Sequence, residues 1–106
     1  MPAEPSSHPD ADGLLMAVRV IGHPAAAAII RFLAGHQRSQ IGQIIVGADL
    51  VRPTVNRHLR DLRELGVIEA EVAIGRVPKY TLNRARVEEI TRDHLAYMLG
   101  EALEDE

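Results

Sequence analysis

Five stretches of the chain place apolar residues at helical spacing, three or four positions apart. The first covers about 14–22, and the second covers 24–35, where Pro24 suits a first helical turn. The last follows Asn83, which can cap a helix, and extends from 84 to about 103. These patterns predict a mainly helical fold.

Two further helical patterns lie head to tail between residues 39 and 65. Ser39 is a candidate cap for the first, which turns isoleucines inward and ends in a turn at 47–50. The second turns Val55, Leu59 and Leu62 inward and projects Pro53, Arg57, Arg60 and Glu64 outward. Such a pair predicts a helix-turn-helix.

A β-hairpin is predicted between the fourth and fifth helices. Gly66 ends the fourth helix, and residues 67–82 give two short strand-like runs around Ile74, Gly75 and Arg76. The order of helices and hairpin predicts a winged helix-turn-helix, a mainly α (α+β) fold with five helices and a two-stranded wing.

The ends of the chain differ from its centre in composition. Residues 1–12 contain three prolines with serines and acids and no apolar periodicity, which predicts a disordered N-terminal tail. Residues 101–106 are predicted to be an acidic C-terminal tail, which leaves 13–100 as one domain for DNA binding and dimerisation.

The charge is unevenly distributed along the sequence. The net charge is −3, yet residues 52–86 hold eight basic against four acidic side chains. A basic centre between acidic ends can bind a polyanion. The expected partner is therefore double-stranded DNA, and the candidate contacts are Arg52, Pro53, Thr54, Asn56, Arg57, Arg60, Arg76 and Lys79.

The first and last helices carry more apolar surface than so small a domain can cover by itself. We therefore expect a homodimer whose interface includes Leu14, Leu15, Val18, Val87, Ile90, His94, Tyr97 and Met98. A packing role for His94 is expected rather than a ligand role, and for His58 the sequence leaves a packing role and a phosphate contact open.

Other functions find little support in the sequence. There is no cysteine, the five histidines share no spacing, and no phosphate loop or catalytic acid pair is present, so we expect no metal, no cofactor and no enzymatic activity. No signal peptide or run of ~20 apolar residues occurs, which predicts a cytoplasmic protein without a membrane partner.

Over roughly residues 14–99 the sequence resembles the ArsR/SmtB family of winged-helix transcriptional regulators. The resemblance rests on Gly22-His23-Pro24 before the second helix, on the segment 41–68, and on the hairpin end at 79–82. It implies a homodimer joined through the first and last helices, with each recognition helix in a major groove. The sequence departs from the family in having Asp49 where glycine is common and Val51 where a capping serine is usual.

The function expected is therefore a DNA-binding transcriptional regulator, most simply a repressor, acting as a homodimer on an inverted-repeat operator. Two alternatives stay open. One is a winged helix that binds protein, because a fold does not fix function. The other is a regulator gated by a small ligand at the dimer interface, whose identity the sequence does not indicate.

Overall fold

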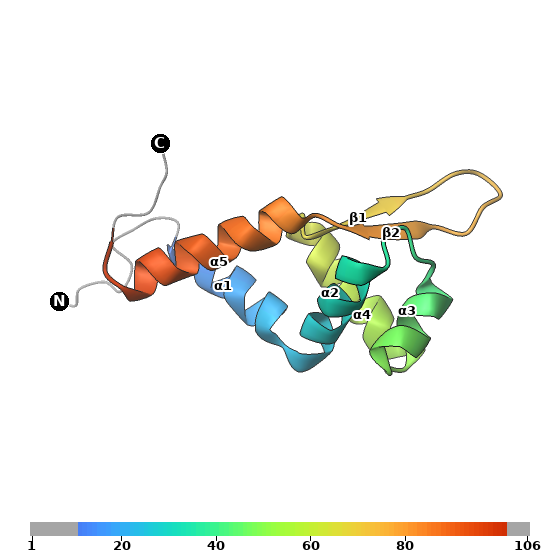
Figure 1. The fold of residues 1–106 in the computed structure, drawn as a ribbon, viewed down its shortest axis with the longest axis horizontal. Coiled ribbons are helices and arrows are strands. Elements are labelled where there is room, and N and C mark those ends of the chain that lie inside the picture. Colours follow the sequence, from blue (N-terminus) through green and yellow to red (C-terminus); the bar gives the residue numbers. More distant parts are fainter. Residues whose placement is uncertain (1–10, 102–106) are drawn as a thin grey trace.

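The structure, a computed structural model, describes residues 11–101. Five helices and one antiparallel hairpin follow each other along the chain (Figure 1). Their bounds are α1 (Ala11–Gly22), α2 (Pro24–Gly35), α3 (Ile41–Ala48), α4 (Arg52–Glu64), β1 (Ile68–Glu71), β2 (Lys79–Leu82) and α5 (Arg84–Met98). The fold is the winged helix-turn-helix that the sequence predicts.

Aliphatic side chains fill a single core around α2. Ile29 and Leu33 of α2 are fully buried, as are Ile44 of α3 and Val55 and Leu62 of α4. These residues recur at helical spacing, so each helix buries one face and leaves the opposite face to solvent. The core thereby fixes the rotation of α4 about its own axis and decides which of its side chains point outward.

The helices α1 and α5 lie alongside each other and extend away from the wing (Figure 1). Ile90 of α5 is 2% exposed and Ala17 of α1 is 3% exposed, and both belong to the core cluster. The α1–α5 pair is therefore part of the folded domain and also one end of the molecule.

Two boundaries differ from the sequence prediction. The α1 helix begins at Ala11, so the predicted boundary at residue 13 lies inside it, while residues 1–10 of the predicted tail and 102–106 lie outside the described part. The α5 helix ends at Met98 rather than near residue 103, because Gly100 adopts a left-handed conformation with φ of 74°.

The N-cap of α3 is Gln40 and not Ser39, which corrects the sequence prediction. The Gln43 side chain accepts a hydrogen bond from the Gln40 backbone N–H at 2.8 Å. The Ser39 hydroxyl donates instead to the His36 carbonyl at 2.6 Å, and its backbone pairs with Tyr80 of β2. Pairing with the wing takes Ser39 away from the helix start.

The wing is attached at its base to the loop between α2 and α3. Its two strands pair from Ile68 opposite Leu82 to Glu71 opposite Lys79. Ser39 and Tyr80 exchange two backbone hydrogen bonds of 3.1 and 2.8 Å. The Gln37 side chain accepts a third hydrogen bond from the Leu82 N–H at 2.8 Å. The hairpin base therefore keeps a fixed position next to α3.

Candidate nucleic-acid interface

The α4 helix has one face in the core and one in solvent. Val55, Leu59 and Leu62 are buried. Within the predicted contact set, Pro53, Asn56, Arg57 and Arg60 of α4 are exposed, as is Arg52 at its start, while Thr54 is half-buried. The helix that the sequence predicts to enter a DNA groove thus presents its polar and cationic side chains on an accessible surface.

The start of α4 is electropositive. Its first turn contains Arg52 and no acidic residue, and Pro53 occupies a position where no backbone N–H partner is needed. The free N–H groups of a helix start carry partial positive charge, so an arginine there adds to the helix dipole and does not balance it. An approaching phosphate would meet both contributions.

Most cations of this surface have no protein partner. Among the described residues, the acids form ion pairs with Arg38, Arg60 and Arg86, whereas Arg52, Arg57, Arg76 and Lys79 form none. The Arg60 pair with Asp61 is long at 3.7 Å, and the arginine side chain stays 67% exposed. Such an exposed pair is weak and leaves the guanidinium free to bind elsewhere.

The wing places Arg76 near its tip and Lys79 at the start of β2. Arg76 is exposed between the two strands, and Lys79 is half-buried. Opposite Lys79 in the sheet lies Glu71, which also accepts two hydrogen bonds from the Arg38 guanidinium, at 3.1 and 3.2 Å. These bonds from Arg38 lower the pKa of the Glu71 carboxyl.

Arg38 helps to hold the wing in place, a role that the sequence did not predict. It adopts a left-handed backbone conformation with φ of 62° and reaches a residue 33 positions away, where it connects the loop after α2 to β1. No periodic pattern marks it, because the contact depends on the fold. The carboxylate it binds would otherwise present unpaired negative charge at the end of β1, opposite Lys79.

The turn between α3 and α4 contains Asp49 in a left-handed conformation, with φ of 59° and ψ of 52°. This is the position where the family commonly has glycine, and aspartate tolerates the conformation better than most residues. The Asp49 N–H donates to the Val46 carbonyl at 3.2 Å and the Leu50 N–H to the Ile45 carbonyl at 3.1 Å. The turn between α3 and α4 therefore forms without glycine.

His58 packs in the core, which resolves the alternatives left open by the sequence. It is 6% exposed, and its ring lies 4.4 Å from the ring of His23, between centroids. Neither ring nitrogen of His58 has a hydrogen-bond partner among the described residues. Burial lowers the pKa of His58, and the neighbouring His23 and Arg57 lower it further.

The predicted dimer surface divides into three levels of exposure. Tyr97 and Met98 are exposed, at 39% and 60%. Ile90 is already buried within a single chain, so little of it is left for a partner. The half-buried members are Leu14, Leu15, Val18, Val87 and His94. Three further exposed side chains, Met16 of α1, Leu95 of α5 and Leu99 directly after α5, were not among the predicted residues.

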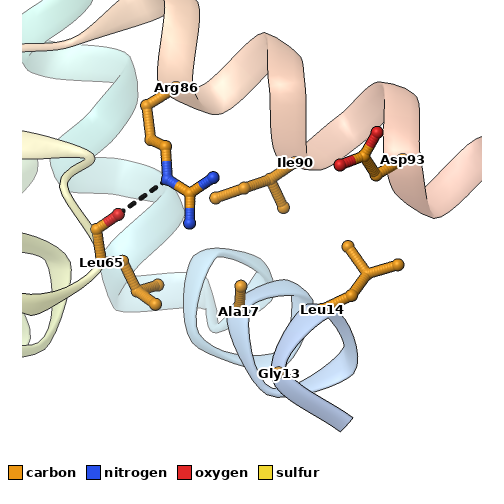
Figure 2. A pocket seen from close by; sticks show the side chains of 7 residues that line it. All are labelled: Gly13, Leu14, Ala17, Leu65, Arg86, Ile90 and Asp93. Carbon is orange, nitrogen blue, oxygen red and sulfur yellow. Dashed lines mark hydrogen bonds between the residues drawn. The ribbon is translucent and has the colours of Figure 1, made fainter. Parts of the chain in front are cut away.

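A cavity of about 370 Å³ opens between α1, the end of α4 and α5 (Figure 2). Its lining combines Leu14 and Ala17 of α1 with two charged side chains of α5, Arg86 and Asp93. The Arg86 Nε donates to the Leu65 carbonyl at 2.8 Å. Sequence analysis identified none of these polar groups as convergent, because they come together only when α5 packs on α1.

Two further properties concern residues 11–101 alone. No group of three or more His, Cys, Asp or Glu side chains there is arranged to hold a metal ion. No single helix there has both the length and the hydropathy to cross a membrane, and only α1 and α2 taken together, with a 75° bend between them, satisfy both measures.

Comparison with known proteins confirms the resemblance. Residues 23–70 match the model of the arsR family of bacterial regulatory proteins, a stretch that runs from the cap of α2 into β1. No curated protein matches the sequence.

Solved structures share the fold at low sequence identity. A MarR-family transcriptional regulator from Silicibacter pomeroyi is 21% identical with a TM-score of 0.59, over 82% of this chain and 64% of that one. The transcriptional repressor BigR from Xylella fastidiosa is 19% identical with a TM-score of 0.62, over 88% and 91%. The homodimeric winged helix-turn-helix DNA-binding domain Mb0332 from Mycobacterium bovis, a possible ArsR-family regulator, is 20% identical with a TM-score of 0.54, over 89% and 95%. The fold of this chain is thus shared with these solved structures, and residues 23–70 resemble the arsR family.

Proposed function

We propose, on the premise that residues 23–70 match the arsR family model, that the protein is a sequence-specific DNA-binding transcriptional regulator. The observation that carries the proposal is the outward face of α4, where Asn56, Arg57 and Arg60 are exposed on a helix whose other face is locked in the core. A protein-binding winged helix would favour a neutral or apolar face at this place. Binding, not catalysis, is the role this surface supports.

The proposed contacts fall into two classes. Thr54, Asn56, Arg57 and Arg60 enter the major groove, where arginine can bind guanine in a forked geometry and asparagine can bind adenine. Arg52, Arg76 and Lys79 approach phosphates or the minor groove, which gives affinity without direct sequence readout. Pro53 supports the first turn next to the backbone. A regulator of this kind acts in the cytoplasm, together with the DNA.

We propose a homodimer joined through α1 and α5. Support comes from the exposed apolar side chains of Met16, Leu95, Tyr97, Met98 and Leu99, which share one end of the domain. A lasting interface buries more than ~1,000 Å² in total. Sedimentation at micromolar concentration tests this, and a clean monomer of 11.6 kDa would exclude the dimer.

A two-fold dimer places two recognition helices on one side of the duplex. The operator is then an inverted repeat with half-sites centred ~10 bp apart or a small multiple. Repression is the simplest output, because a dimer on a promoter blocks access to it. The repressor BigR, which shares the fold, supports this direction.

Selection from a random duplex library tests the function directly. On the selected site, Arg57→Ala should cost about 1–3 kcal/mol and relax specificity, because it removes a base contact. Lys79→Ala should weaken all sequences alike and reduce the salt slope by about one unit, because it removes a phosphate contact.

Arg31→Ala is the matched control, since it removes an exposed positive charge from α2 that belongs neither to α4 nor to the wing. Its affinity should stay close to the wild type. If no sequence is enriched, and if the Arg57→Ala/Arg60→Ala double variant binds DNA as well as the wild type, DNA binding is excluded and a protein partner becomes the better account.

A second candidate, regulation by a small ligand, is favoured by the cavity between α1 and α5 (Figure 2). A cavity of about 370 Å³ lies in the size range of small-molecule sites, and Arg86 and Asp93 offer it opposite charges. A ligand there would alter the packing of α5 on α1 and so the dimer. A compound screen by NMR in which no amide of Gly13, Ala17 or Ile90 shifts would argue against it.

A further inference from the structure

Val51 is an exposed apolar residue at the start of α4 that takes no part in the hydrophobic core. It is the N-cap of α4, it makes no side-chain capping bond, and it is 64% exposed. It does not belong to the apolar residues that pack against the core. A capping serine or aspartate at this place would serve the helix better.

The other described helix starts show how unusual this is. His23 caps α2 by accepting from the Ala25 N–H, and Asn83 caps α5 by accepting from the Arg86 N–H. At α3 the Gln43 side chain accepts from the N–H of the cap residue. Of the helix starts within residues 11–101 that include their cap, only that of α4 lacks such a bond. Departures from local rules tend to occur at functional positions.

The position of Val51 is rigid. Its carbonyl accepts the first helical hydrogen bond from the Val55 N–H at 3.0 Å, and Val55 is fully buried. A β-branched side chain has few rotamers, so its two methyl groups point in a defined direction. Val51 thus presents a small, preorganised apolar surface at the end of the helix that enters DNA first.

The surroundings of Val51 determine which partner fits. Arg52 follows it, and the first turn of α4 has no acid, so the neighbourhood attracts a polyanion. On the base edges of the major groove the apolar group is the C5-methyl of thymine, which small apolar side chains contact. We propose that Val51 reads a thymine methyl group in each half-site, an inference that rests on the proposed DNA-binding function.

Replacing thymine by deoxyuridine tests the contact, since it removes the methyl group and keeps every hydrogen-bonding group. In the selected operator, each thymine of one half-site is replaced in turn. One replacement should weaken the wild type about fourfold, the value of burying one methyl group. The other replacements should have little effect. For Val51→Ala, which keeps only the Cβ methyl group, the preference for thymine over uracil at the sensitive position should become smaller than in the wild type.

The variant Val51→Ser distinguishes a role of Val51 in thymine recognition from a role in stability. A serine cap should raise the unfolding temperature, while the preference for thymine over uracil is lost. A purely structural valine would move stability and binding in the same direction.

Two negative results have different meanings. A wild type that selects a site but binds thymine and uracil equally at every position overturns the role of Val51 and leaves DNA binding intact. A library that yields no enriched site overturns DNA binding itself, and the Val51 contact with it.

Discussion

Gly47 of α3 packs against the Phe32 side chain of α2, and its replacement by alanine is a test of the packing between these helices. A Cβ built at Gly47 overlaps the Cδ1 and Cε1 atoms of the Phe32 ring and lies 2.8 Å from Cζ. Carbon atoms in contact are about 3.5–4.0 Å apart, so the ring would have to move by roughly 1.5 Å. The ring is stacked on His36, with centroids 4.3 Å apart and planes 5° from parallel.

Two opposing effects set the size of the change. Alanine is better than glycine inside a helix by up to about 1 kcal/mol. Forcing an extra carbon into a packed contact costs about 1–3 kcal/mol. The steric effect wins, and we expect Gly47→Ala to lower the free energy of unfolding by roughly 1 kcal/mol, within a range of about 0–2.

Gly42 on the same helix is the matched control, because a Cβ added there meets nothing within 4 Å. Gly42→Ala should be neutral or stabilising. Urea unfolding followed by circular dichroism measures both variants. The double variant Gly47→Ala/Phe32→Ala should show less than the sum of the single losses, because the clash needs both side chains. A Gly47→Ala protein as stable as Gly42→Ala would refute the close packing of α3 on α2.

Three further predictions concern stability. Burial lowers the pKa of His58 below 6.5, so the unfolded chain binds the proton more readily than the folded one. The free energy of unfolding should therefore fall as the pH drops through 6.5. Urea titrations at several pH values should show this dependence of stability on pH, and His58→Gln should reduce it. Asn83→Ala removes the cap on the Arg86 N–H and should cost about 1 kcal/mol in the same assay, and no loss would discount the cap. Asp49→Ala should cost about 1 kcal/mol because of its left-handed backbone, whereas Asp49→Gly should be neutral or stabilising; equal effects would contradict that conformation.

Helical periodicity was sufficient to predict the outward face of α4. Val55, Leu59 and Leu62 had to face the core, and once they do, the helix geometry places Arg57 and Arg60 in solvent. No long-range information is needed for that step. The wing was predictable for a similar reason, since Gly66 and the turn around Gly75 adopt positive φ angles that mark the ends of the elements.

What the sequence did not predict depends on contacts between distant segments. The hydrogen bond from Arg38 to Glu71 and the ring contact between His23 and His58 join residues of separate elements. No local sequence pattern predicts such contacts. The end of α5 was missed for another reason: the apolar pattern continues past Gly100, and the glycine, not the pattern, decides where the helix stops. Ile90 shows that an apolar stripe alone does not tell a core residue from an interface residue.

The attachment of the wing at its base leaves the tip of the hairpin free to vary in length and sequence. The hydrogen bonds of Gln37 and Ser39 attach β2, at the base of the hairpin, to the loop between α2 and α3. Glu71 is the last paired residue of β1. Beyond that point, residues 72–77 are all exposed. Insertions and deletions there leave every anchoring bond in place, so the tip can be lengthened, shortened or exchanged while α4 keeps its orientation. Evolution, or a designer, can thus vary the reach of the wing independently of the helix.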